Sequence, residues 1–150
     1  MPLKKKPTGK LISFEGSEGS GKTTQIARLA AAFQRAKREV LTTREPGGTP
    51  LGGALRQLLL HTREPQAPCS RAELLLYAAD RAQHVAEKIR PALARGGVVL
   101  CDRFVHSTLA YQGYGRGLPL ADIRWLNEYA TQGLMPDLVL LLDLDPVAGL

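Results

Sequence analysis

The stretch Lys10-Leu-Ile-Ser-Phe-Glu-Gly-Ser-Glu-Gly-Ser-Gly-Lys-Thr-Thr24 decides the fold of this chain. Gly16, Gly21, Lys22 and Thr23 match the pattern G-x-x-x-x-G-K-[ST], a loop whose backbone N–H groups surround the phosphates of a nucleotide. In this pattern the lysine reaches the β- and γ-phosphate oxygens, and the hydroxyl binds Mg²⁺. The motif therefore predicts a site for a nucleoside triphosphate.

The residues on either side of the loop supply the context that the motif needs. Residues 11–14 form a short apolar run typical of a strand, and residues 24–37 place Ile26, Leu29 and Phe33 at helical spacing. A helix that begins at the loop adds its positive N-terminal dipole to the anion site. The alternative is a Gly/Ser-rich turn that matches by chance, and the order strand, glycine loop, helix argues against it.

Composition limits the class of protein. The chain has 150 residues, 44 % hydrophobic and 23 % charged, which suits one globular domain. We expect a flexible tail over residues 1–9 and a P-loop domain over residues 10–150. No apolar run is long enough to span a membrane. The two cysteines, Cys69 and Cys101, have no metal-ligand spacing. The simplest location for the protein is therefore the reducing cytoplasm.

The net charge of +6 indicates an anionic ligand without choosing between a polymer and a mononucleotide. Basic residues are not interleaved with aromatic residues in a stripe, as they are in many nucleic-acid-binding proteins, so we expect no nucleic-acid partner. A protein that holds several phosphate groups at once also needs basic side chains.

The remainder of the chain alternates between predicted strands and helices. Ser70 is expected to cap a long helix, with Glu73 completing a capping box, and Pro91 is expected to kink or restart that helix. Cys101 is expected to be buried in a strand, where cysteine acts as a small hydrophobe. The expected strands are 40–43, 98–101 and a buried 137–143; the expected helices are 50–60, 70 onward, 106–114, 120–132 and one beginning at 146.

This alternation, with apolar strands that lack a polar face, predicts an α/β fold with a parallel sheet covered by helices on both faces. In such sheets ligands bind at the carboxyl ends of the strands. The phosphate loop, Arg44 and the pair Asp102-Arg103 each follow a predicted strand. We therefore expect them to converge on one site.

The predicted convergence has a chemical consequence. Lys22, Arg44 and Arg103 would repel one another unless anions lay between them, and the arginine fork suits bidentate phosphate binding. A triphosphate on the loop leaves the two arginines for a second phosphate, an arrangement for phosphoryl transfer that needs no protein nucleophile. None of the three histidines has a visible catalytic partner, so we expect exposed or packing roles for His61, His84 and His106. Surface or capping roles are expected for Asp143 and Asp145.

Several motifs together resemble the thymidylate kinase family of the bacterial type. The resemblance covers nearly the whole chain after the tail and implies a nucleoside monophosphate kinase-like member of the P-loop NTPase fold class. The motifs are FEGSEGSGKTT at 14–24, REPGGT at 44–49, LLLYAADRAQH at 74–84, DRFVHSTLAYQG at 102–113 and PDLVLLLD at 136–143.

The resemblance implies ATP-dependent phosphorylation of dTMP to dTDP for DNA precursor synthesis, with ATP as co-substrate and Mg²⁺ as cofactor. Lys22, Arg103 and Asp102 would be catalytic, and Thr23 and Asp102 would bind the metal. The ATP-binding residues implied are Gly16, Ser17, Glu18, Gly19, Ser20, Gly21, Lys22, Thr23 and Thr24.

The resemblance also implies how dTMP is held. Arg44 and Arg103 would clamp its phosphate, Tyr77 would stack on thymine, and Arg81, one helical turn later, would hydrogen-bond the base. The remaining residues implied for dTMP are Glu18 at the 3′-hydroxyl, Thr108 and Gln112 at the base edge, Tyr111 at the sugar 2′ position, and Ser107. Without the resemblance, Tyr77 and Tyr111 are equally readable as packing residues and Glu18 as a solvated acid.

The resemblance further implies a homodimer, for which the helical faces around Leu74 and Leu126 offer apolar surface. Members of the family continue past this point with a basic lid that supplies a catalytic arginine. Here the sequence stops at Leu150, and Gly19 occupies the loop position where the other type carries its arginine. We therefore expect the substrate-binding part of a larger protein. Another nucleoside monophosphate kinase, a nucleotide-dependent switch and a non-catalytic binding fragment remain alternatives.

Overall fold

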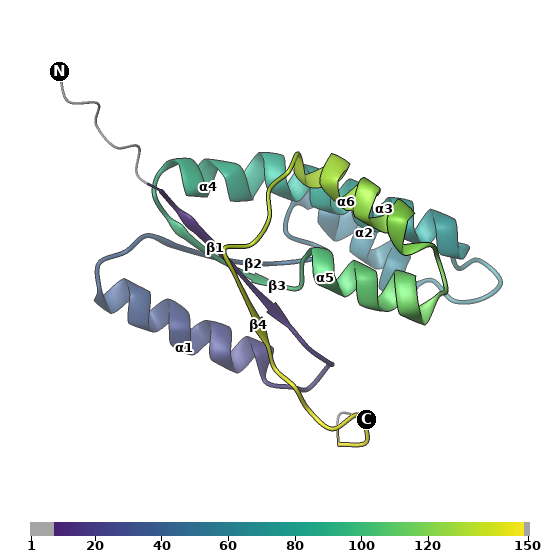
Figure 1. Cartoon of the computed structure of the whole chain (residues 1–150), viewed down its shortest axis with the longest axis horizontal. Helices are drawn as coiled ribbons and strands as arrows, with labels where there is room; N and C mark the ends of the chain where they lie inside the picture. Colours follow the sequence, from purple (N-terminus) through teal and green to yellow (C-terminus); the bar gives the residue numbers. More distant parts are fainter. Residues whose placement is uncertain (1–7, 149–150) are drawn as a thin grey trace.

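The computed structural model describes residues 8–148 and contains one four-stranded parallel sheet in the order β2-β3-β1-β4. Helix α1 covers one face of the sheet, and the other helices gather on the opposite face (Figure 1). The α/β fold with helices on both faces is therefore confirmed. The strands are β1 Lys10–Glu15, β2 Val40–Arg44, β3 Val98–Asp102 and β4 Leu138–Leu141.

The helices of the described residues follow the predicted order, and the helix predicted over 106–114 is formed by α5 together with η2. Two segments, η1 and η2, are π-helical, a form that often occurs at functional sites. The bounds are α1 Lys22–Arg35, α2 Pro50–His61, α3 Ser70–His84, η1 Val85–Ile89, α4 Arg90–Ala94, α5 Val105–Thr108, η2 Leu109–Gly115 and α6 Leu120–Thr131.

The register of the sheet aligns the strand ends that carry the predicted site. Asp102 at the end of β3 lies opposite both Phe14 of β1 and Arg44 of β2. The loop that follows β1 is therefore beside Arg44 and Asp102 in space. All four residues of β3 from Val98 to Cys101 are buried, as expected for a central parallel strand.

The sequence predicts a kink or a restart at Pro91; in the structure the helical backbone continues from α3 through the π-helical segment η1 into α4. The N–H of Arg90 bonds to the carbonyl of Val85 across the π turn, and α4 begins there with Pro91 in its first turn. Proline is tolerated at this position because a first-turn N–H has no partner within its own helix.

The predicted capping box at Ser70 is wrong. The N-cap residue is Cys69, and no side chain caps the helix. Glu73 instead accepts hydrogen bonds from Gln112 and Arg116, because an ionised carboxylate gains more from a charged partner than from a helix N–H.

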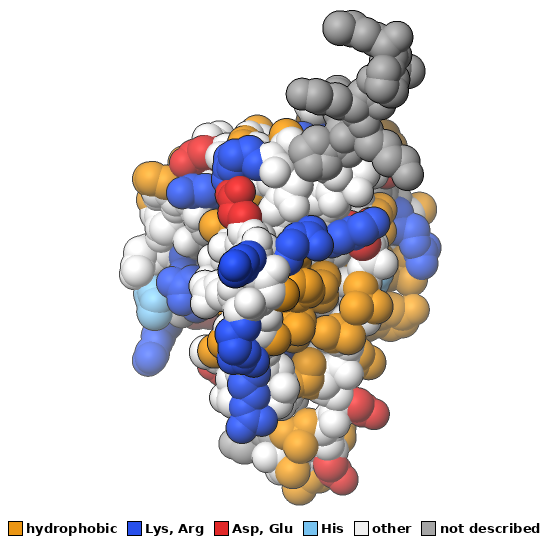
Figure 2. All heavy atoms as spheres, turned by 90° about the vertical axis from the view of Figure 1, so that its left-hand side faces the viewer, with side chains coloured by type: hydrophobic (Ala, Val, Ile, Leu, Met, Phe, Trp, Pro, Cys, Tyr) orange, Lys and Arg blue, Asp and Glu red, His pale blue; other side chains and the backbone are white. Residues whose placement is uncertain are grey.

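The prediction that residues 137–143 form a buried strand is also wrong. Strand β4 pairs only with β1 and lies at the edge of the sheet, with Leu138 and Leu141 at 49 % and 68 % exposure. Figure 2 shows hydrophobic side chains gathered at the surface on this side of the molecule. An apolar run predicts a strand, but its position in the sheet decides its burial.

Three smaller predictions concern the helical faces and the chain ends. Leu74, expected to offer surface for a dimer, is buried instead, whereas its neighbour Leu75 is exposed. The predicted tail falls mostly outside the described residues, but Gly9 already bonds to the carbonyl of Leu93. Of the helix predicted to begin at Pro146, only residues 146–148 are described, and they form a turn.

Within residues 8–148 no helix has the length and apolar character to cross a membrane.

Candidate active site

A cavity of about 670 Å³ opens at the carboxyl ends of the strands, where the predicted site residues meet. Of the predicted residues, Gly16, Ser17, Ser20 and Thr24 belong to the loop but do not line this cavity. The predicted residues that line it are Glu18, Gly19, Gly21, Lys22, Thr23, Arg44, Tyr77, Arg81, Asp102, Arg103, Ser107, Thr108, Tyr111 and Gln112.

The phosphate loop joins β1 to α1 in the predicted order. Gly16 has a φ of 143°, and a Cβ there would lie 2.6 Å from the carbonyl oxygen of Leu142, so only glycine fits. Helix α1 begins at Lys22, whose Nζ donates to the carbonyls of Gly16 and Ser17 at 3.1 and 2.9 Å. Burial lowers the pKa of Lys22, and the charge of Arg103 lowers it further.

Asp102 and Thr23 form the part of the site that suits a divalent cation. Both line the main cavity and also a smaller one of about 390 Å³ on its flank. The Oδ1 atom of Asp102 is buried and has no hydrogen-bond partner among the described residues. A carboxylate and a hydroxyl are ligands that Mg²⁺ accepts, so the residues present fit this ion.

Arg103 is held in an unusual backbone conformation at the end of β3. Its φ is 69°, and its N–H donates to the carbonyl of Phe14 at 2.9 Å. The guanidinium lies over the ring of Tyr111, 5.1 Å from the ring centroid. Positive φ in a residue with a long side chain is uncommon and is found where function fixes the geometry.

Glu15, which the sequence did not single out, supports Arg103 from β1. Its two carboxylate oxygens accept hydrogen bonds from the Phe104 N–H at 2.9 Å and from the Ser107 hydroxyl at 2.5 Å. The same hydroxyl accepts from Nη1 of Arg103 at 3.3 Å. Burial raises the pKa of Glu15, while these hydrogen bonds oppose the rise. Glu15 thereby ties the start of the phosphate loop to the arginine.

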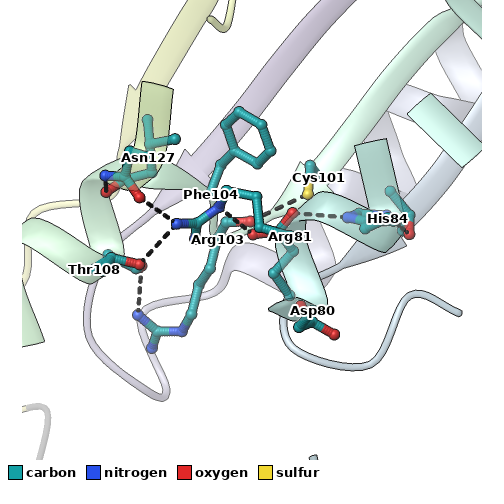
Figure 3. Close-up of polar contacts among 12 residues, drawn as sticks. Asp80, Arg81, His84, Cys101, Arg103, Phe104, Thr108 and Asn127 are labelled. Atoms are coloured by element: carbon teal, nitrogen blue, oxygen red, sulfur yellow. Dashed lines mark hydrogen bonds and ion pairs between the residues drawn. The ribbon is translucent and has the colours of Figure 1, made fainter. Parts of the chain in front are cut away.

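Arg81 of α3 also lines the cavity and is only 2 % exposed. Its Nε donates to Glu45 at 2.8 Å, and its Nη1 donates to Thr108 and Asn127 at 2.9 and 2.7 Å (Figure 3). The guanidinium also lies over the ring of Phe104. Nη2 makes no hydrogen bond within the described residues, so its two N–H groups are left for a ligand.

The sequence shows no partner for His84 and predicts an exposed or packing role; the structure places it in the core with two hydrogen-bond partners. His84 is fully buried, and its two ring nitrogens bond to Glu45 at 2.8 Å and to Thr43 at 2.7 Å. His84 follows Arg81 by three residues and so shares its helical face, the signal that would have linked them. His61 is exposed and His106 is half-buried.

Glu45, His84 and Cys101 lie close enough to suggest a buried metal site, but their hydrogen bonds argue otherwise. Burial raises the pKa of the Cys101 thiol well above its ordinary value, and the thiol donates to the carbonyl of Arg103. Glu45 already accepts from Arg81 and His84. The cluster is a hydrogen-bonded part of the core.

The REPGGT loop takes its shape from α3. The N–H of Gly47 donates to Oδ1 of Asp80 at 3.0 Å, and a Cβ on Gly48 would lie 2.5 Å from Nε2 of His84. Arg56 of α2 donates to the carbonyl of Pro46 at 2.8 Å and lines the cavity. Arg56 is a fourth arginine of the site, and the sequence did not reveal it because nothing local in α2 marks it.

A P-loop sheet whose cavity continues past the loop into a compartment lined by arginines defines a nucleoside monophosphate kinase. The profile of the thymidylate kinase family matches residues 14–150. The chain belongs to the thymidylate kinase family, whose members transfer a phosphoryl group from ATP to dTMP.

Individual relatives agree with this assignment. The chain is 63 % identical over 139 residues to a thymidylate kinase of Synechococcus sp. (strain JA-3-3Ab), covering 93 % of this chain and 67 % of the relative. It is 57 % identical over 141 residues to the thymidylate kinase of Bifidobacterium longum (strain DJO10A), covering 93 % of this chain and 68 % of that relative. A crystal structure of thymidylate kinase from Ehrlichia chaffeensis superposes with a TM-score of 0.86 at 39 % identity, over 95 % of this chain and 81 % of that one. The chain spans about two thirds of the length of these curated relatives.

Proposed function

We propose that this chain binds ATP on the phosphate loop and dTMP in the rest of the cavity, and that it catalyses the formation of dTDP. The observation that carries the proposal is the continuity of one cavity from Lys22, past Arg44 and Arg103, to Tyr77. Cations at one end and an aromatic side chain at the other match a nucleotide's phosphate and base. The family of the chain supports the same substrates.

At the donor end, the amides of residues 16–24 surround the ATP phosphates, and Lys22 neutralises the charge that develops on the transferred group. Thr23 and Asp102 would hold Mg²⁺, for which the unpartnered Oδ1 of Asp102 is the supporting observation. When bound, the ion neutralises the phosphate oxygens. Burial, and after it the charge of Arg103, lowers the pKa of Lys22. A phosphate between the two cations would relieve their repulsion.

At the acceptor phosphate, Arg44 and Arg103 act as a clamp, with Ser107 and Glu15 holding Arg103 in place. Transfer between two positioned phosphates depends on alignment and charge neutralisation, so no covalent intermediate with the protein is needed. Arg56 adds positive charge to the same compartment.

The base and sugar occupy the inner part of the cavity. Tyr77 stacks on the thymine ring, and the free Nη2 of Arg81 donates to a carbonyl of the base. Thr108 and Gln112 meet the base edge. Tyr111 crowds the 2′ position of the sugar, and Glu18 meets the 3′-hydroxyl.

Calorimetric titration of dTMP and UMP, with Arg103→Ala as the matched variant, tests the acceptor site. We expect dTMP to bind more tightly than UMP and the variant to lose at least about tenfold in affinity, because a charged hydrogen bond is removed. If UMP binds as tightly as dTMP, or if the folded chain binds neither nucleotide, the thymidylate assignment of the acceptor site fails. The nucleotide-dependent switch and the non-catalytic binding fragment then become the favoured interpretations. A coupled assay for ADP release then asks whether the chain turns over, which a binding fragment would not do.

We further propose a cytoplasmic homodimer. The supporting surface is the exposed side of α3 and α6, which carries Leu75 and the stacked pair Trp125 and Tyr129, with ring centroids 5.6 Å apart. Sedimentation of the wild-type chain and of Trp125→Ser tests this surface. A monomeric wild-type chain at the concentrations of the activity assay would overturn the dimer.

A further inference from the structure

The side chain of Gln112 lies between the cavity and a carboxylate. Gln112 belongs to the π-helical segment η2, is almost completely buried and lines the cavity. Its Nε2 donates to Oε1 of Glu73 at 2.8 Å. Arg116 holds the same carboxylate from the solvent side, with Nε and Nη2 at 3.2 and 3.1 Å from its two oxygens. Three side chains, from α3, from η2 and from the residue that follows η2, thus form a hydrogen-bonded network that ends at the cavity.

The hydrogen-bonded network of Glu73, Arg116 and Gln112 fixes which way the Gln112 amide points. An amide has a donor end and an acceptor end of nearly equal size, so packing alone selects neither orientation. An ionised carboxylate only accepts hydrogen bonds, so Glu73 must face the NH₂ group. The carbonyl oxygen of Gln112 makes no hydrogen bond within residues 8–148 and is left for a ligand. Arg116 keeps Glu73 in this role by supplying the opposite charge.

We propose that Glu73, held by Arg116, is a positioning residue that presents the Gln112 carbonyl oxygen to the substrate and thereby selects bases with an N–H at ring position 3. Thymine and uracil carry this donor on their pairing edge, whereas cytosine has an unprotonated ring nitrogen there. Two acceptors facing each other in a buried site leave both without a hydrogen bond. This inference rests on the proposed function, because it assumes that a pyrimidine base occupies the inner cavity.

A purely structural role is the competing explanation. The same contacts also tie α3 to η2, and their loss would loosen the site for every ligand. The two roles differ in what they do to selectivity. A loosened site would bind all pyrimidine nucleotides more weakly by the same factor. A Gln112 amide that is free to turn can instead direct its NH₂ group toward the base, which favours cytosine relative to thymine.

The experiment measures the dissociation constants of dTMP, dUMP and dCMP by calorimetry for the wild-type chain and for Glu73→Gln. The replacement is isosteric but can donate as well as accept, so it no longer dictates the orientation of Gln112. We expect the preference for dTMP over dCMP to narrow by about five- to tenfold, the contribution of one neutral hydrogen bond. The preference for dTMP over dUMP should not change, since both bases carry the same N–H. Arg81 retains part of the selectivity because its donor meets the carbonyl at position 4.

Glu87→Gln is the matched control. Glu87 accepts a hydrogen bond from Gln83 at 2.8 Å on the exposed surface and does not line the cavity, so the same chemical change there should leave all three affinities unaltered. Arg116→Gln, at an exposed position, is a second variant that tests the proposal if Glu73→Gln does not fold. It should narrow the preference for dTMP over dCMP by a smaller factor.

Each outcome decides between the explanations. A narrowed preference for dTMP over dCMP, with the preference over dUMP kept, supports the positioning role. A uniform loss of affinity, or an unchanged preference in both variants, overturns it and leaves Glu73 structural. If the wild-type chain binds none of the three nucleotides, the proposed function itself fails, and this result is distinct from either variant's behaviour.

Discussion

Two arginines of the cavity, Arg44 and Arg81, are held in opposite ways. At the phosphate end, Arg44 is exposed and makes no side-chain hydrogen bond within the described residues. At the base end, Arg81 is buried and bonds to Glu45, Thr108 and Asn127. A charged phosphate attracts an exposed arginine over a distance and completes its hydrogen bonds. An uncharged base exerts no such force, so the groups that read it must be oriented in advance.

The strongest test of this contrast replaces the residue that orients the base end. Glu45→Ala leaves the buried guanidinium of Arg81 without its counter-ion and Nδ1 of His84 without its partner. We expect the free energy of unfolding to fall by about 3–5 kcal/mol, the usual cost of an uncompensated buried charge. Urea denaturation of the free chain measures it. A loss smaller than about 1 kcal/mol would mean that the pair contributes little to orientation.

The adjacent residue provides the control for the phosphate end. Arg44→Ala should leave the free energy of unfolding within about 0.5 kcal/mol of wild type, as exposed substitutions do. Affinity for dTMP, measured by calorimetry, should nevertheless fall by about tenfold or more, because a charge-assisted phosphate contact is lost. Two neighbouring residues would then separate stability from binding.

Two adjacent glycines test how tightly the base end is packed. A Cβ on Gly52 would lie 2.4 Å from Oδ1 of Asp80, whereas a Cβ on Gly53 would meet nothing within 4 Å. We expect Gly52→Ala to destabilise the fold by about 1–3 kcal/mol through overpacking. Gly53→Ala should stabilise it by about 0.5–1 kcal/mol, because alanine favours the helix. Thermal and urea unfolding of both variants provide the comparison. Equal effects would show that α2 moves freely away from α3.

The smallest expected effect is a dependence of stability on pH at Asp80. Burial raises the pKa of Asp80 above 3.8, and the charge of Glu45 raises it further, while the Gly47 N–H, His84 and Arg81 oppose the rise. A raised pKa means that the folded state holds the proton more tightly, so this contribution is full below about pH 4 and is lost as pH rises through the folded value.

Asp80→Asn removes the titrating group and keeps an acceptor for Gly47. The stability of this variant relative to wild type should therefore increase as pH rises through this range. Urea denaturation at several pH values measures the difference. A difference that stays constant with pH would show that Asp80 titrates as an exposed acid does.

Much of the fold could be predicted from local pattern. The apolar run at 98–101 and the glycine loop at 16–24 each have one structure that satisfies their backbone and burial requirements, and the structure confirms both. The apolar run at 137–143 predicts a buried strand by the same argument, yet β4 lies at the edge of the sheet and is exposed. The difference is in the neighbours, because burial depends on what packs against a strand.

The candidate site divides in the same way. Residues carried by motifs, such as Lys22 and Arg103, could be placed at the strand ends from the sequence. Glu15 and Glu45 could not, because a glutamate beside a motif gives no sign of which distant donor it will meet. Glu73 shows the limit most clearly, since its local position suggested a helix cap and its partners lie about forty residues away.

The sequence by itself determined the parallel α/β order, the phosphate loop and the convergence of cations at one edge of the sheet. These follow from periodicity, from the backbone demands of glycine and from the direction of parallel strands. Only the tertiary structure decided which acids hold which arginines, and which end of the Gln112 amide faces the cavity. Those choices arise from pairing between segments far apart in the chain, where hydrogen bonds and charge must be satisfied together in a buried space.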